Sequence, residues 1–152
     1  MNKFGVLMEN LVDEFLDRLK QRGMEPSDSP GESFGENKQG RVANLYEVKS
    51  PKMAVVMHVK GSTSEKGFWG MSVDAADFLI AVDEEYEFKK CSLVLLHKNT
   101  DTAYVLSAQE IKRLIADKNI ANDNQYKINE GELIGRYSKL TSFDSILVKL
   151  GL

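Results

Sequence analysis

The sequence predicts an α+β fold in which an antiparallel or mixed central sheet is flanked by helices. Two observations predict it: apolar residues recur with helical spacing at the start of the chain, and short apolar runs separated by turn residues follow. The expected order of elements is α-β-β-β-α-β-β-α-α. Most of the strand connections in this order are short, which is typical of a sheet with helices packed on it.

The first expected element is an amphipathic helix from about Lys3 to Arg22. Its apolar positions lie three or four residues apart, at Phe4, Leu7, Leu11, Phe15 and Leu19. Gly23 follows at a position where glycine often ends a helix. Residues 24–40 are rich in Pro, Gly, Ser and acids, which indicates a loop. This loop is either a mobile surface segment or a functional segment that becomes ordered on binding.

Three extended segments are expected next, over 42–48, 53–59 and 67–72. The second contains the run AVVM, which is typical of a strand that is buried on both faces. The segments 50–52 and 60–66 have the composition of turns. Together they predict a meander of two or three antiparallel strands.

A helix and a hairpin follow the meander. Ser72 is a good N-cap for a helix that begins near Val73. The apolar run over 92–97 predicts a strand, and 98–102 contains the Asn and Asp typical of a hairpin turn. Residues 103–106 are the expected partner strand.

The last third of the chain carries two more helix starts. Ser107 followed by Glu110 forms a capping box, with Ile111, Leu114 and Ile115 as the buried side of its helix. The segment 126–128 has the pattern of a short edge strand. Either Thr141 or Ser142 caps a final helix whose apolar positions are Phe143, Ile146, Leu147 and Leu150.

Composition excludes several classes of protein. Hydrophobic residues make up 42% of the chain, the net charge is -3, and there is one Cys. These values exclude a wholly disordered chain, a disulfide framework and a thiolate-rich metal site. We expect a single domain over 1–152. The longest apolar stretch, around 92–96, is far too short to span a membrane, so we expect no membrane partner and a cytoplasmic setting.

Most catalytic motifs are absent from the sequence. His58 and His97 are the only histidines, and neither lies in a zinc-binding spacing. We expect each to be a partly buried, hydrogen-bonded strand residue, and Cys91 to be a packed thiol. The glycines near position 67 do not match a phosphate-binding loop, and no serine-hydrolase elbow is present.

The segment KGSTSEKGFWG has the most unusual composition. It holds the only Trp, Trp69, next to Phe68 and close to Lys66. Aromatic rings at a glycine-rich edge can stack on bases or anchor a protein partner. The alternative follows from strand alternation, because at least one of the two rings then points into the core.

Lysines gather around the predicted meander. They would form one basic face for nucleic acid if the strands pair as expected, and otherwise a scattered, solvated set. The six are Lys49, Lys52, Lys60, Lys66, Lys89 and Lys90. A protein partner, or a homodimer formed through an exposed sheet edge, remains an alternative.

One acidic pattern suggests a divalent cation. Glu47-Val48-Lys49 is an acid-X-Lys triplet in an extended segment, and Asp28 lies upstream. Two carboxylates beside a lysine can hold Mg²⁺ and activate water against a phosphodiester. Charged tripeptides of this kind are also common by chance.

With a leading helix that carries an acid, a strand meander, a helix and further strands, the chain resembles the PD-(D/E)XK, or restriction-endonuclease-like, superfamily. The resemblance covers about residues 3–116. It implies Mg²⁺-dependent hydrolysis of DNA or RNA, with an acid of the first helix, Glu9 or Glu14, near the metal. It also implies a second acid followed by acid-X-Lys on the next strand.

Two assignments of this motif are open. In the first, Asp28 is the leading acid and Glu47 and Lys49 form the triplet. In the second, Glu47 is the leading acid, and His58 and Lys60 take the triplet positions on a better strand, although His58 replaces an acid. A third possibility is that the strands match and no active site survives. The nuclease hypothesis requires Glu47 and Lys60 to lie on the same face of the sheet.

Overall fold

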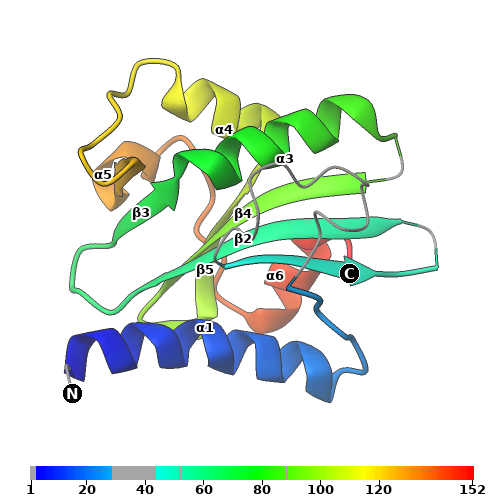
Figure 1. Cartoon of the computed structure of the whole chain (residues 1–152). Helices are drawn as coiled ribbons and strands as arrows, with labels where there is room; N and C mark the ends of the chain where they lie inside the picture. The colour runs from blue at the N-terminus through cyan, green and yellow to red at the C-terminus, as the bar shows by residue number, and fades with distance from the viewer. Residues whose placement is uncertain (1–2, 29–43, 52, 88) are drawn as a thin grey trace.

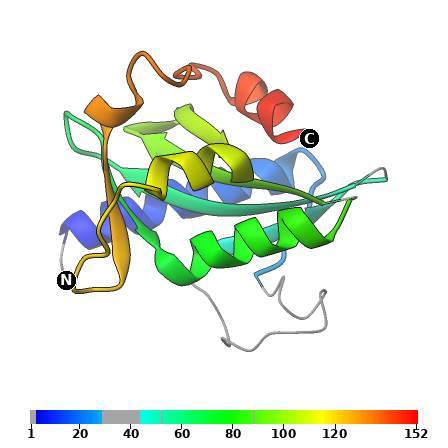
Figure 2. The same cartoon turned by 90° about the horizontal axis from the view of Figure 1, so that it is seen from above.

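The computed structural model describes residues 3–28, 44–51, 53–87 and 89–152, with side chains described from residue 11 onward. Helices cover both faces of a four-stranded sheet (Figure 1). In Figure 1 the helix α1, Lys3–Gln21, lies below the sheet, and the helices α3, Val73–Glu85, and α4, Ala108–Ile115, lie above it; Figure 2 views the same layers from above. The predicted α+β class, with a mixed central sheet flanked by helices, is confirmed.

The central sheet has the strand order β1-β2-β4-β5. The pairs β1–β2 and β4–β5 are antiparallel hairpins, and β2 and β4 run parallel in the middle of the sheet. Both edges carry one additional bridge, from Ser27 to β1 and from Leu140 to β5. The bounds are β1 Leu45–Lys49, β2 Ala54–Ser62, β4 Lys89–His97 and β5 Asn99–Ser107.

The parallel pairing of β2 and β4 depends on the helix that connects them. This is α3, Val73–Glu85, which crosses one face of the sheet together with α4, Ala108–Ile115. Ser72 caps α3 and Ser107 caps α4, the latter in a capping box with Glu110. Both predicted caps are therefore confirmed. We call this side of the sheet the α3 face.

The opposite side, the α1 face, is covered by the first and last helices. α1 spans Lys3–Gln21 and α6 spans Phe143–Leu150, close to their predicted ranges. Ser142 is the residue that caps α6, and Gly151 ends it with a left-handed backbone at φ 87°. Phe15 of α1 meets Phe143 of α6 edge to face at 5.7 Å, so the two helices share one apolar layer.

Of the two or three strands predicted for the meander, only the first two pair with each other. β3, Phe68–Ser72, does not pair with β2 but forms a separate antiparallel ribbon with β6, Gln125–Asn129. The ribbon buries Trp69 and Met71 in the core of the α3 face. A short helix that the sequence did not indicate, α5 at Glu130–Leu133, follows β6.

The hairpin between β4 and β5 is also tighter than expected. Lys98 alone connects the two strands, where a turn over 98–102 was predicted. Lys98 adopts φ 71° beside a register shift at Leu96 and His97, and this geometry lets the chain reverse within one residue. No helix in the described part of the chain is long and apolar enough to cross a membrane.

Candidate functional site

The β1–β2 hairpin places three of the predicted site residues on the α3 face. Glu47 lies opposite Val56, and His58 lies opposite Leu45. Because side chains alternate along a strand, Glu47, His58 and Lys60 all project from the same face. Glu47 and His58 are therefore diagonal neighbours on adjacent strands, where Cα atoms lie roughly 7–8 Å apart.

Glu47 is buried, with 1% of its surface exposed. Its Oε2 accepts a hydrogen bond from Lys89 Nζ at 3.2 Å, so the carboxylate is held by an ion pair across the sheet. Its Oε1 is also buried and has no hydrogen-bond partner among the described residues. An unpartnered buried oxygen costs free energy unless something else binds it.

In His58, as in Glu47, one polar atom of the side chain is hydrogen-bonded and the other has no partner among the described residues. It is 1% exposed, and Nδ1 lies 3.0 Å from the carbonyl oxygen of Asn44. A carbonyl only accepts, so Nδ1 carries the proton and Nε2 keeps its lone pair. Nε2 is buried and unpartnered within the described residues. Burial lowers the pKa of His58 to about 4, with help from the charge of Lys60, so the ring is neutral at pH 7.

Lys60 is the third residue of this face. Its side chain is partly buried, and within the described residues it makes no hydrogen bond or ion pair. Burial lowers the pKa of Lys60, and the nearby charge of Lys127 lowers it further. An ammonium group in this environment favours an anionic partner.

The structure does not bring Asp28 to this cluster. Ser27 pairs with Glu47 through two backbone hydrogen bonds of 2.8 Å, so Ser27 shares the α3 face and Asp28 points to the other side. In agreement, the pKa of Tyr46 on the α1 face is raised by burial and then by the charges of Asp13 and Asp28. Glu9 belongs to α1, and its side chain lies outside the described residues.

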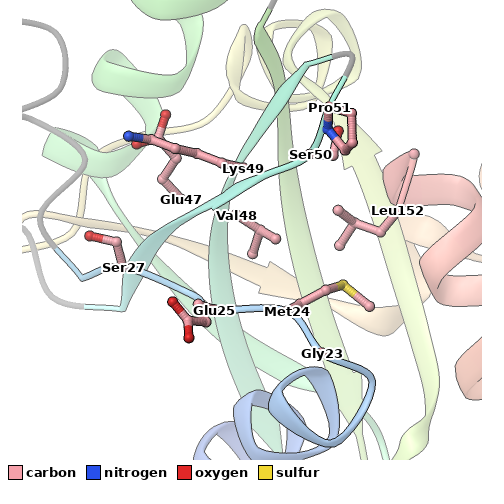
Figure 3. A pocket seen from close by; sticks show the side chains of 11 residues that line it. Gly23, Met24, Glu25, Ser27, Glu47, Val48, Lys49, Ser50, Pro51 and Leu152 are labelled. Atoms are coloured by element: carbon pink, nitrogen blue, oxygen red, sulfur yellow. The ribbon is translucent and has the colours of Figure 1, made fainter.

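A groove of about 590 Å³ lies beside the β1 edge (Figure 3). Glu47 and Lys49 project from one side of β1, whereas Val48 projects from the other side towards Met24 and Leu152. The groove therefore opens mainly onto the apolar layer of the α1 face. It touches the Glu47 strand but does not contain His58 or Lys60 among its lining residues.

The two aromatic residues of the GFWG segment have different environments. Phe68 is 47% exposed and lies two residues from the exposed Lys66. Trp69 is 1% exposed, and its Nε1–H donates to the carbonyl of Leu96 at 2.9 Å. Trp69 therefore belongs to the core, and of the pair only Phe68 is presented at the surface.

The predicted lysine face is divided between two sides of the sheet. Lys49 and Lys89 both align with Ala54, so they share the α3 face with Lys60. Lys90 is on the opposite side, where its Nζ donates to the Lys149 carbonyl at 2.7 Å. Lys66 lies in the turn before β3, and Lys52 lies outside the described residues.

Sequence reasoning did not predict the roles of Lys89 and Asn44, the two residues that orient this cluster. Lys89 reaches Glu47 only because β4 runs parallel to β2, and β4 is separated from β1 by a whole helix. Asn44 offers its carbonyl to His58 from a left-handed backbone at φ 62°. Asn tolerates this conformation well, which was the one signal in the sequence for a sharp bend there.

A second polar network, beyond the C-terminal end of β2, was also not predicted. Glu130 Oε2 accepts from Tyr104 Oη and from Lys139 Nζ, each at 2.8 Å, and Oε1 accepts from the Gly67 N–H at 3.2 Å. Lys139 Nζ also donates to His97 Nδ1 at 2.8 Å. We call these residues the Glu130 network; its polar groups bond one another and fix the turn between β2 and β3.

This network perturbs the acidity of its members. Burial would by itself raise the pKa of Glu130, but the hydrogen bonds from Lys139, Tyr104 and Gly67 together hold it at about 2. Burial and then the bond to Glu130 raise the pKa of Tyr104 to about 12. His97 donates its Nε2–H to the carbonyl of Ser64 at 2.8 Å, so both of its nitrogens are engaged.

Glu47 and His58 are two residues of the α3 face that could hold a metal ion. Within the described ranges, no group of three or more His, Cys, Asp or Glu side chains is placed to hold a metal ion. Glu47 Oε1 and His58 Nε2 are nevertheless two buried acceptors that no described residue supplies with a donor. They fit a cation that takes two ligands from the protein and completes its coordination with water or phosphate oxygen.

The fold is distantly similar to that of a solved protein structure. A Holliday junction resolvase, Hjc, from Archaeoglobus fulgidus aligns with a TM-score of 0.44 and 9% identity. The alignment covers 82% of this chain and 89% of the resolvase chain. No protein-family model and no curated protein matches this sequence. At this level of similarity, an activity has to be inferred from the residues of this chain itself.

Proposed function

We propose that this chain is a small restriction-endonuclease-like domain that binds nucleic acid and hydrolyses phosphodiester bonds at the Glu47 and His58 cluster. One observation carries the proposal. Glu47 Oε1 and His58 Nε2 are buried acceptors without a partner among the described residues, and they share one sheet face with Lys60. Buried polar groups of this kind are rare and occur where an ion, a water or a substrate binds.

The geometry favours the second assignment of the acid-X-Lys motif. Glu47, as the leading acid, lies on β1, and His58 and Lys60 lie two residues apart on the antiparallel neighbour β2. All three share a face. Asp28 lies on the other face of the sheet, which disfavours the first assignment.

In this proposal each residue of the cluster has a distinct role. A divalent cation at Glu47 and His58 would polarise a phosphoryl oxygen. Lys60 binds a phosphate oxygen, and its partial burial strengthens that charge pairing because less water screens it. Lys89 holds the Glu47 carboxylate in place through Oε2. The exposed Lys49 on the same face contacts the nucleic-acid backbone beyond the cluster.

The test compares two carboxylate variants in a nuclease assay. Glu47→Gln should abolish metal-dependent cleavage of DNA or RNA, because it removes the anionic ligand and keeps the shape of the side chain. Asp28→Asn is the matched control and should leave cleavage unchanged, because Asp28 points to the α1 face. Equal loss in both variants would restore the first assignment. If the wild-type protein cleaves no DNA or RNA with Mg²⁺ or Mn²⁺, the catalytic proposal fails.

An alternative function rests on Phe68. A ring that is 47% exposed beside Lys66, on a turn fixed by the Glu130 network, is a suitable anchor for a protein partner. Phe68→Ser should then abolish capture of the partner in a pull-down without changing the unfolding curve. Trp69 is not suitable for this test because its replacement would disrupt the core. Unchanged capture by Phe68→Ser would count against this alternative.

A further inference from the structure

We infer that the Glu47 and His58 pair selects a first-row transition-metal dication, such as Mn²⁺ or Co²⁺, over Mg²⁺. The inference rests on the proposed function for the location of the site, but not on catalytic activity. It departs from the magnesium site of two carboxylates that the sequence suggested, because the diagonal neighbour of Glu47 on its sheet face is the imidazole of His58.

In both Glu47 and His58, one polar atom of the side chain is hydrogen-bonded and the other has no partner among the described residues. Lys89 occupies Glu47 Oε2, and the Asn44 carbonyl occupies His58 Nδ1. The second atom of each, Oε1 and Nε2, is buried and has no partner in the described part of the chain. A metal-binding histidine commonly donates its other ring N–H to a carbonyl in this way, which fixes both the tautomer and the ring orientation.

Two unpartnered acceptors on one face cannot satisfy each other. Oε1 of an ionised Glu47 has no proton to give, and Nε2 has none once Nδ1 carries it. Each atom therefore requires a cation or a hydrogen-bond donor, and because the two residues are neighbours on one face, one cation or one water molecule between them would serve both. The ammonium groups of Lys89 and Lys60 do not fill this role, because Lys89 contacts Oε2 and Lys60 makes no hydrogen bond to a described residue.

The chemistry of the donor atoms decides which cation fits. Mg²⁺ is a hard ion that prefers oxygen ligands, whereas imidazole nitrogen favours transition metals, with affinity rising from Mn²⁺ through Co²⁺. The site offers one carboxylate oxygen and one imidazole nitrogen. The nitrogen therefore adds to the binding affinity for a transition metal but not to the affinity for Mg²⁺. Two protein ligands leave the remaining positions of the ion for water or a phosphate oxygen.

The test is isothermal titration calorimetry of the full chain with CoCl₂, MnCl₂ and MgCl₂ in separate runs, without nucleic acid. Wild-type protein should bind Co²⁺ at least about tenfold more tightly than Mg²⁺, and show a visible Co²⁺ absorption band from nitrogen ligation. His58→Asn should weaken Co²⁺ binding by at least about tenfold. Asn is chosen because its side-chain NH₂ can still donate to the Asn44 carbonyl where Nδ1 did, while no atom replaces Nε2.

His97→Gln is the matched control. His97 is the other histidine and is also buried, but both of its nitrogens are engaged by Lys139 and Ser64. Its replacement should leave Co²⁺ affinity unchanged. A measurement on the wild-type protein covers the case in which His58→Asn does not fold. With ¹⁵N-histidine labelling, bound Mn²⁺ should broaden the ring signals of His58 more strongly than those of His97.

Each outcome separates this inference from the proposed nuclease function. Tight Co²⁺ binding that depends on His58, without any cleavage, supports the metal site and removes the nuclease. Cleavage with Mg²⁺ together with equal affinities for Mg²⁺ and Co²⁺, or insensitivity to His58→Asn, overturns the inference and keeps the nuclease. If neither metal binds, or if Mn²⁺ broadens the signals of both histidines equally, the inference is also overturned.

Discussion

Replacing Glu130 by Gln should lower the free energy of unfolding at neutral pH. It should also make this free energy less dependent on pH below about 4.5. The carboxylate accepts from Tyr104, Lys139 and the Gly67 N–H, and its pKa is held at about 2 against an ordinary value of 4.5. A displacement of this size corresponds to about 3 kcal/mol of stability before screening by water is taken into account. Because Lys139 is 33% exposed and water screens its charge, we expect about 1–2 kcal/mol.

The sign of the pH dependence follows from the lowered pKa. The ionised form of Glu130 is favoured in the folded state, so its contribution is fully present above pH 4.5. The contribution declines as the pH falls from 4.5 towards 2, where the folded protein also binds the proton. The difference in unfolding free energy between wild type and Glu130→Gln should therefore shrink over that range.

The assay is urea denaturation of both proteins at pH 7, 5, 4 and 3. Other carboxylates titrate in the same range, but they are common to both proteins and largely cancel in the difference. Glu110→Gln provides a control, since its carboxylate belongs to the α4 capping box and not to the Glu130 network. The reasoning would be refuted if the difference in unfolding free energy between wild type and Glu130→Gln stayed constant from pH 7 to pH 3.

Two further predictions concern local packing and capping. Gly67→Ala would place a Cβ 2.2 Å from Cη2 of Trp69, whose ring is fixed by its bond to Leu96, so urea denaturation should show a loss of about 1–3 kcal/mol. An unchanged midpoint would mean that the Trp69 ring is free to move. Ser107→Ala removes the hydroxyl that caps α4 and should cost about 1 kcal/mol, measured in the same way; a stability equal to wild type would show that α4 does not depend on this cap.

Local sequence signals predicted most of the fold. Periodicity located α1, and the capping residues Ser72, Ser107 and Ser142 located the starts of three further helices, because each of these features depends on neighbouring residues only. The pairing of β3 could not be predicted in this way. Its partner β6 lies more than fifty residues further along the chain, and nothing in either pentapeptide specifies the other.

The residues of the proposed site were named from the sequence, but their arrangement was not. Glu47 was named for its acid-X-Lys triplet, His58 and Lys60 through the resemblance to a nuclease superfamily, and strand alternation places them on one face. The choice between Asp28 and His58 as the companion of Glu47 needed the bridge at Ser27, which sets the side to which Asp28 points. The role of Lys89 needed the parallel neighbour β4, and the burial of Trp69 needed the β3–β6 ribbon.

The β3–β6 ribbon has a consequence for how the chain folds. A nascent chain that ends before Gln125 contains β3 without its partner strand, so the edge of β3 is unpaired and the core around Trp69 and Met71 lacks Tyr126 and Ile128. Joining strands this far apart in sequence costs loop-closure entropy before the contacts are made, and such contacts form late and slowly. The last quarter of the chain thus completes the core begun by the middle, and folding to the native state waits for synthesis of β6.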